Sequence, residues 1–333
     1  MVVRLVDKLK DFLITCQGRD VSLKYLREEL KLDPNSPAWD GIREYLRQLS
    51  DKKIVRPSGR NDGVYHVVTP ALPVPIFAIQ RIKSPPFELI FPKDRHTEME
   101  MDFAQDVVLR EGDLILISGM SNYGKTALCL NFCAENIDRR PVLMGNEYTS
   151  WVDENFIPTP RFVNRLESMD WVNWVDEEGN DKITLLPVRS DYAEHIIPDR
   201  INIIDWINID TGEHYMIGTV LENIKKELGR GIAIVAIQKN EGATAGRGGQ
   251  FTKDFTDLEL LVDKFGTNDV LMTIGKVKEY NQNIIGKHYA YSIHRGVKVV
   301  GFREVKFCPN CHGSGAKKGE ECELCLGKKY IDK

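Results

Sequence analysis

The chain has 333 residues, of which 42% are hydrophobic and 28% are charged, and its formal net charge is -4. These proportions exclude a disordered chain, and the net charge gives no support to nucleic-acid binding outside local patches. No apolar run approaches the roughly 18 to 20 residues of a membrane span, and the N-terminus is amphipathic rather than a signal peptide. We therefore expect a cytoplasmic protein of a bacterial, archaeal or phage-infected cell, without a membrane partner.

The first 70 residues predict a small domain of helices and strands. Apolar spacing indicates a first helix near the N-terminus, a second over 21–32 and a third that begins at Ser36-Pro37. Two strands are predicted over 54–55 and 64–68, joined by a turn-rich tip. Three helices and a hairpin resemble a winged-helix domain.

In the winged-helix family the third helix enters the DNA major groove and the hairpin contacts the backbone. The resemblance therefore implies contacts with duplex DNA by three arginines, Arg43, Arg47 and Arg60. Residues 1–70 are only mildly basic, however, with 13 Lys and Arg against 10 Asp and Glu. Because many winged helices bind proteins instead, a protein-binding or oligomerisation role stays open for this domain.

A proline-rich stretch over 71–87 predicts a linker. The apolar run from Phe87 to Phe91 is expected to dock on the domain that follows. That domain is predicted to span residues 88–305, and a small third domain is predicted over 306–333.

Residues 119–126 fit GxxxxGK[ST], the pattern of a phosphate-binding loop. A short apolar run over 114–118 precedes the pattern and a helix-forming run over 127–131 follows it, so the loop joins a predicted strand to a predicted helix. Glycines let successive backbone N–H groups point into one concavity, where the helix dipole adds positive potential. The predicted ATP ligands are Gly119, Met120, Ser121, Asn122, Tyr123, Gly124, Lys125 and Thr126.

Five side chains are expected to carry the chemistry of hydrolysis. Lys125 would reach the β- and γ-phosphates, while the Thr126 hydroxyl would bind Mg²⁺. Asp205 ends a predicted strand and would bind the same Mg²⁺ through water. Glu147 follows another strand and could polarise the attacking water, and Gln238 at a third strand end could sense the γ-phosphate. Strands that alternate with helices predict an α/β fold with a mainly parallel central sheet.

The predicted loop over 239–256 is glycine-rich and carries three cations, Lys239, Arg247 and Lys253. Its flexibility and charge suit a single-stranded DNA backbone passing beside the nucleotide, with a solvated surface loop as the alternative. Residues 151–199 predict irregular structure. Three tryptophans of that region are expected to fill the core, with base stacking as the alternative: Trp151, Trp171 and Trp174.

The order of these motifs resembles the RecA superfamily, close to phage-type relatives of the DnaB helicase and KaiC ATPase domains. The resemblance covers about residues 88–305 and includes the AIQK sequence followed by a GRGG loop. It implies a RecA-like fold and homo-oligomeric rings or filaments, with ATP bound between neighbours. In that superfamily a basic pair reaches the neighbour's γ-phosphate, and Lys276 with Lys278 matches the pair. Such cations stabilise the transferring phosphoryl group.

Two CxxC pairs lie in the last 26 residues and contain four of the seven cysteines: Cys308, Cys311, Cys322 and Cys325. Four thiolates at this spacing predict a closed tetrahedral zinc shell, and the first pair resembles a DnaJ-type CxxCxGxG knuckle. Because a segment this short has little core of its own, the predicted zinc ribbon over 306–333 would be stabilised by its metal.

These expectations combine into an ATP-hydrolysing oligomer that uses ATP, Mg²⁺ and Zn²⁺ and acts on DNA. A helicase-type or recombinase-type motor in replication, recombination or repair is the main hypothesis. The alternative is an ATP-controlled winged-helix switch, or a nucleotide-bound scaffold, without translocation along DNA.

Overall fold

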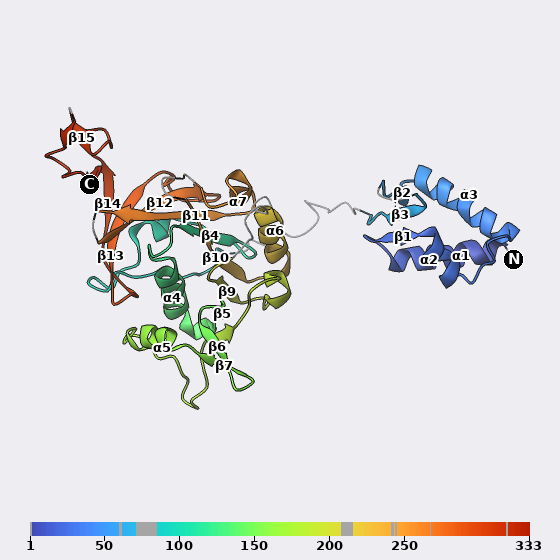
Figure 1. Cartoon of the computed structure of the whole chain (residues 1–333), viewed down its shortest axis with the longest axis horizontal. Helices are drawn as coiled ribbons and strands as arrows, with labels where there is room; N and C mark the ends of the chain where they lie inside the picture. Colours follow the sequence, from blue (N-terminus) through green and yellow to red (C-terminus); the bar gives the residue numbers. More distant parts are fainter. Residues whose placement is uncertain are drawn as a thin grey trace. The chain divides into compact units, whose positions relative to one another are not determined.

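The computed structural model describes residues 2–59, 62–70, 85–207, 216–240, 243, 245–266, 268–317 and 319–333. The chain divides into two compact units, Met1–Lys83 and Ser84–Lys333, whose elements are labelled in Figure 1. Arg60, one of the arginines predicted to contact DNA, lies outside the described residues.

The first unit packs three helices with a small antiparallel sheet of strand order β1-β3-β2. Its elements are α1 (Val2–Thr15), β1 (Asp20–Ser22), α2 (Leu23–Glu29), α3 (Pro37–Asp51), β2 (Val55–Pro57) and β3 (Val64–Val67). One apolar stripe from each helix fills the core, where Leu9, Leu26 and Leu46 are fully buried.

Two helix starts in this unit show how local chemistry sets the boundaries. Ser36 accepts a hydrogen bond from the backbone N–H of Trp39 and proline follows it, which confirms the predicted start of α3. The predicted start of the second helix at Val21 is wrong. Residues 20–22 pair with β3 instead, and Ser22 caps a helix that begins at Leu23.

The second unit contains a ten-stranded sheet of order β17-β14-β13-β12-β11-β4-β10-β9-β5-β8. Its strands are β4 (Leu114–Gly119), β5 (Val142–Met144), β8 (Thr184–Leu186), β9 (Ile201–Ile204), β10 (Ile232–Gln238), β11 (Leu258–Phe265), β12 (Asp269–Val277), β13 (His288–His294), β14 (Lys298–Phe307) and β17 (Tyr330–Asp332). Pairing is parallel from β11 to β8 and antiparallel from β11 to β17. This confirms a mixed α/β protein whose central sheet is mostly parallel.

Both faces of the sheet are covered, so its central strands are apolar throughout. Along β4, Ile115 and Ile117 pack in one core with α4 (Lys125–Glu135), whereas Leu114 and Leu116 pack in a second core with α6 (Ile217–Glu227). Three 3-10 turns complete this part of the chain: η1 (Asp102–Asp106), η2 (Ile137–Arg139) and η3 (Tyr192–His195). The expected docking of the run after the linker is confirmed, since Phe91 is buried in the first of these cores.

The region over 151–199 is more regular than its sequence predicts. It contains the hairpin β6 (Thr149–Val152) and β7 (Asn155–Pro158), the helix α5 (Pro160–Glu167), and β8 at the edge of the sheet. Trp171 and Trp174 pack partly against the core. The prediction that Trp151 fills the core is wrong, because its side chain is 62% exposed and contacts Phe156 on the hairpin.

The cysteine-rich end of the chain is fastened to the sheet. It contains β15 (Ala316–Lys317) and β16 (Glu320–Glu321), and then β17 returns to pair with β14. Where the cysteine-rich segment leaves β14 and rejoins the sheet at β17, the rings of Phe307 and Tyr330 stack with centroids 4.7 Å apart, and both contact His288. None of the helices in the described parts of the chain combines the length and hydrophobicity that a bilayer span needs.

Glu259 on β11 is a carboxylate inside the second unit. It has no exposed surface, and among the described residues neither of its oxygens makes a hydrogen bond. The nearest cation, Lys253 Nζ, is 3.6 Å from Oε2. Burial raises the pKa of Glu259, although Lys253 opposes this shift.

Replacing Glu259 by Gln tests this buried charge through the pH dependence of stability. Because the folded-state pKa is raised, the stability that Glu259 contributes is present below its unfolded pKa and is lost as the pH rises through the folded value. The difference in Tm between Glu259→Gln and the unaltered protein should therefore shift in favour of the variant as the pH rises above the ordinary pKa of a glutamate. Glu227→Gln, at an exposed position ending α6, is the control, and equal behaviour of the two variants contradicts the assignment.

Candidate functional site

Four neighbouring parallel strands end at one edge of the sheet, and the predicted site residues follow those ends. Gly119 ends β4 and pairs with Gln238 at the end of β10. On the other side of β10, β9 ends immediately before Asp205, and β5 beyond it ends shortly before Glu147. Because parallel strands present their carboxyl ends together, residues far apart in the sequence gather at this edge.

The loop over 119–126 can turn tightly because glycine occupies its two crowded positions. A Cβ on Gly119 would lie 2.2 Å from Cγ2 of Val262, and a Cβ on Gly124 would lie 2.3 Å from Cδ1 of Ile293. Gly124 also has a φ of +86°, in the left-handed region that disfavours other residues. The N-terminal turn of α4 begins directly after it, with backbone N–H groups that have no partner within the helix.

Lys125 is held against this loop. Lys125 is only 7% exposed. Its Nζ donates hydrogen bonds to the carbonyl oxygens of Gly119 at 3.0 Å and Met120 at 2.7 Å. Burial lowers the pKa of Lys125, and the carboxylate of Asp205 opposes that shift most strongly. The ammonium group therefore lies between the loop backbone and the acidic end of β9.

Asp205 is 3% exposed, and its two carboxylate oxygens have different surroundings. Oδ2 accepts a hydrogen bond from the Tyr148 hydroxyl at 2.5 Å, whereas Oδ1 has no hydrogen-bond partner among the described residues. Burial raises the pKa of Asp205, and the hydroxyls of Tyr148 and Thr126 oppose the shift. A carboxylate oxygen without a partner, beside the Thr126 hydroxyl, offers the oxygen ligands that a hydrated divalent cation prefers.

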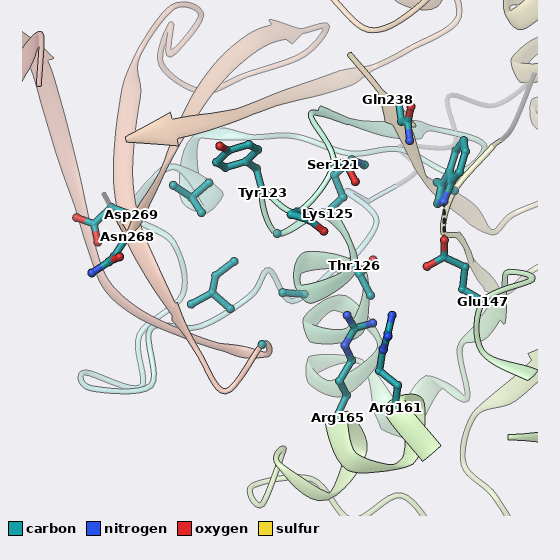
Figure 2. Close-up of a pocket in the computed structure, with 17 residues that line it drawn as sticks. Ser121, Tyr123, Lys125, Thr126, Glu147, Arg161, Arg165, Gln238, Asn268 and Asp269 are labelled. Carbon is teal, nitrogen blue, oxygen red and sulfur yellow. Dashed lines mark hydrogen bonds between the residues drawn. The ribbon is translucent and has the colours of Figure 1, made fainter. Parts of the chain in front are cut away.

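A cavity of about 460 Å³ lies against the loop and is lined by Lys125 and Thr126, whereas Asp205 does not line it. Figure 2 shows Glu147 and Gln238 on one side of the loop residues Ser121, Lys125 and Thr126. Glu147 is exposed, and its Oε1 accepts from Trp206 Nε1 at 3.5 Å. The loop residues that line the cavity are Ser121, Asn122, Tyr123, Gly124, Lys125 and Thr126.

The cavity is also lined by four polar residues that the sequence analysis did not assign to the site: Arg161, Arg165, Asn268 and Asp269. The arginines belong to α5, and Figure 2 shows their side chains extending from that helix toward Thr126. The sequence contained one indication of this arrangement: the arginines are four residues apart in a helix capped by Thr159, which places them on one helix face. The helix was not predicted, because the surrounding sequence has no regular hydrophobic pattern.

Lys276 and Lys278 do not line this cavity. They lie near the end of β12, whereas Asp269 at the beginning of the same strand does line it. Seven residues of extended chain separate Asp269 from Lys276, which corresponds to roughly 24 Å. Lys276 donates to the carbonyl oxygen of Lys253, and Lys278 Nζ is 2.9 Å from Oδ1 of buried Asp257.

The three cations predicted to meet single-stranded DNA have different surroundings. Arg247 is exposed, and its charge contributes, after the effect of burial, to lowering the pKa of Lys125. Lys253 is 25% exposed beside Glu259. Lys239 departs from the prediction, because its side chain is fully buried in an ion pair with Asp263 and cannot meet a nucleic acid in this conformation.

On the first unit, two of the predicted DNA contacts lie on the surface of α3. Arg43 is exposed, and Arg47 is 76% exposed with its guanidinium 3.4 Å from Glu44. An exposed pair of this kind contributes little to stability, so the arginine remains free to exchange its partner.

The four C-terminal cysteines come together as predicted. Their sulfur atoms all lie within 4.8 Å of one another, with 3.8 Å between Cys308 and Cys322 and 3.6 Å between Cys311 and Cys325. Thiolates at about 2.3 Å from a tetrahedral ion are about 3.8 Å apart, so these separations fit a metal ion such as zinc. All four residues are buried and none forms a disulfide.

Donors around the cluster favour the thiolate form of two of its members. The backbone N–H of Gly315 donates to Cys311 Sγ at 3.3 Å, and Asn310 Nδ2 donates to Cys322 Sγ at 3.4 Å. Burial opposes ionisation of Cys311. The backbone N–H groups of Gly315 and Gly313, together with the neighbouring thiols, outweigh this effect and lower the pKa of Cys311 to about 6. The backbone N–H of Cys325 lowers the pKa of Cys322. Such hydrogen bonds orient metal-binding sulfurs.

No protein-family model and no curated protein matches the chain. The chemistry of the two sites therefore rests on their own residues: a cavity with cations and carboxylates at the end of a parallel sheet, and four thiols at metal-binding separations.

Metal removal tests the cysteine cluster. The purified protein should contain about one zinc ion per chain by elemental analysis, and a strong chelator should lower its Tm because metal binding and folding of this segment are coupled. Cys322→Ser should lose the metal. Cys16→Ser, in the first unit and outside the cluster, is the matched control and should retain it. Full metal content in Cys322→Ser would show that the cluster is not the site.

Proposed function

We propose that the second unit binds ATP over the 119–126 loop and hydrolyses it, and that the protein acts on DNA as an oligomer. The observation that carries this proposal is the gathering of Lys125, Thr126 and Glu147 around one cavity at the end of a parallel sheet. Asp205 is buried next to this cavity, where its charge acts on Lys125. A triphosphate suits this place because the loop's backbone N–H groups, the start of α4 and Lys125 all present positive charge.

Each group has a role in the proposed reaction. Lys125 binds the β- and γ-phosphates, while Thr126 and Asp205 hold Mg²⁺, whose contribution is to neutralise phosphate charge. The oxygen of a water molecule bonds to the γ-phosphorus as the bond from that phosphorus to the bridging oxygen of ADP breaks. Glu147 accepts the proton of this water. The exposure of Glu147 and its single contact with Trp206 leave the carboxylate able to receive it.

DNA as the partner follows from exposed cations in both units. Arg247 links the two functions, because a DNA backbone drawn to it would approach the ammonium of Lys125. Arg43 and Arg47 provide a second basic surface on the third helix of the first unit, in the manner of a winged-helix domain. On this proposal the metal at the cysteine cluster is zinc and its role is structural.

An oligomer follows from the position of Lys276 and Lys278. They are too far along β12 to reach the cavity of their own chain. In the RecA-superfamily arrangement such a pair completes a neighbour's site. Lys278 pairs with Asp257 within its own chain, but its side chain is 66% exposed, and on this proposal it exchanges that partner for the neighbour's nucleotide. A helicase-type or recombinase-type motor is the form of the proposal that uses all of these residues.

One observation favours a second candidate, an ATP-controlled regulatory switch without translocation. Lys239 is buried in an ion pair and Lys253 neighbours Glu259, so Arg247 is the exposed member of the three predicted DNA contacts. A single cation beside the nucleotide can report DNA binding, whereas a moving strand requires several contacts.

Steady-state ATP hydrolysis by Lys125→Ala tests the proposed site. Turnover should fall by about 10²-fold or more, because the ammonium that offsets phosphate charge is lost. Lys226→Ala, on an exposed face of α6, is the matched control and should hydrolyse ATP normally. Undiminished turnover by Lys125→Ala would show that hydrolysis occurs elsewhere.

Single-stranded and duplex DNA separate the two candidates. A motor predicts that single-stranded DNA stimulates turnover, and that Lys278→Ala loses turnover but regains part of it when mixed with Lys125→Ala. Turnover that no DNA affects, together with specific duplex binding by the whole chain, would support the switch instead.

A further inference from the structure

Arg161 and Arg165 are cations without an internal partner. Among the described residues, no carboxylate lies within 4.0 Å of either guanidinium, and neither makes a side-chain hydrogen bond. By contrast, Arg140 pairs with Asp176. Lys239 pairs with Asp263, and Lys278 pairs with buried Asp257. The two arginines nevertheless line the cavity that also contains Lys125. Three cations facing one cavity repel one another unless an anion lies between them.

The helix that carries these arginines is rigidly joined to the proposed catalytic segment. The backbone N–H of Thr159 donates to the carbonyl oxygen of Tyr148 at 2.8 Å, and the Thr159 hydroxyl donates to that of Glu147 at 3.4 Å. Phe162 is 4% exposed, and its ring lies 4.7 Å from that of Tyr148. Because Tyr148 also donates to Asp205, one buried ring fixes both the carboxylate and α5.

We propose that Arg161 and Arg165 bind the terminal phosphate of the nucleoside triphosphate held by the same chain and stabilise the charge that develops on it during hydrolysis. This inference rests on the proposed function. The guanidiniums accept no proton. They hold the non-bridging oxygens while water oxygen bonds to the γ-phosphorus and the bond to the ADP oxygen breaks. Planar guanidinium groups suit this task because each can donate two parallel hydrogen bonds to a phosphate.

The consequence is that each chain supplies its own cations to the reaction. When subunits assemble, Lys276 and Lys278 then contribute further positive charge to a neighbouring site that already hydrolyses ATP slowly. An isolated subunit should hydrolyse ATP slowly through its arginines, and assembly should raise the rate.

Kinetics of Arg161→Ala, Arg165→Ala and the double variant test the inference. The double variant should lose about 10²- to 10³-fold in kcat, with a smaller change in its affinity for a fluorescent ATP analogue. Lysine at both positions should recover part of kcat, since charge is kept and the bidentate geometry is lost. Arg189→Ala, at an exposed position outside the cavity, is the matched control, and an unchanged Tm shows that each variant folds.

Mixing separates action within a chain from action between chains. If the arginines serve their own nucleotide, a mixture of Arg161→Ala/Arg165→Ala with Lys125→Ala has no intact site and stays inactive. Recovery of turnover in that mixture would overturn the inference, as would a normal kcat in the double variant while Lys125→Ala is inactive. Hydrolysis by Lys125→Ala would instead refute the proposed function on which the inference rests.

Discussion

The hydrogen bond from Tyr148 to Asp205 connects the parts of the second unit on which a reaction would depend. It satisfies one oxygen of a buried carboxylate at the end of β9 and leaves the other oxygen facing Thr126. The same ring packs against Phe162 and so determines where α5 lies. A buried hydroxyl of this kind is costly to leave unpaired, so the two groups keep each other in place. Loss of Tyr148 would therefore disturb both the carboxylate and the helix.

The charges of this unit divide into two groups with different consequences. Lys278 and Lys225 pair with Asp257, and Lys239 pairs with Asp263, so their charges are used within the fold. Arg161 and Arg165 have no such partner among the described residues, and Figure 2 shows them extending from α5 toward the loop. Removal of one member of an internal pair would leave a charge without compensation, whereas unpaired charge beside the cavity creates the positive potential that attracts an anion. Sequence position alone does not reveal to which group a lysine or arginine belongs.

The sequence was informative wherever structure depends on neighbours along the chain. Continuous apolar runs identified β4 and β10, the Ser36-Pro37 cap located α3, and the spacing of Cys308 and Cys311 identified half of the metal cluster. Each of these signals is local. Glu147, Asp205 and Gln238 lie at or just after strand ends, as their sequence predicts, and their proposed roles stay predictions.

The remaining features depend on contacts between distant segments. Lys239 is buried because Asp263 on β11 lies beside it, and Trp151 is exposed because its hairpin extends beyond the core. Arg161 and Arg165 line the cavity because Tyr148 contacts their helix, through the ring of Phe162 and the backbone of Thr159. No periodicity in the sequence encodes those contacts, so the region over 151–199 looked irregular.

The pairing of β17 with β14 gives the cysteine cluster a role at the border of the sheet. The chain leaves β14, passes through the four thiols and returns as β17, which pairs with the last three residues of β14, Val305 to Phe307. Without β17, this end of β14 would be an open strand edge of the kind that recruits strands from other molecules. A metal ion bound by the four cysteines would hold β17 against β14 and so protect this edge against aggregation. Oxidation of the sulfurs would release the metal and thereby affect solubility as well as folding.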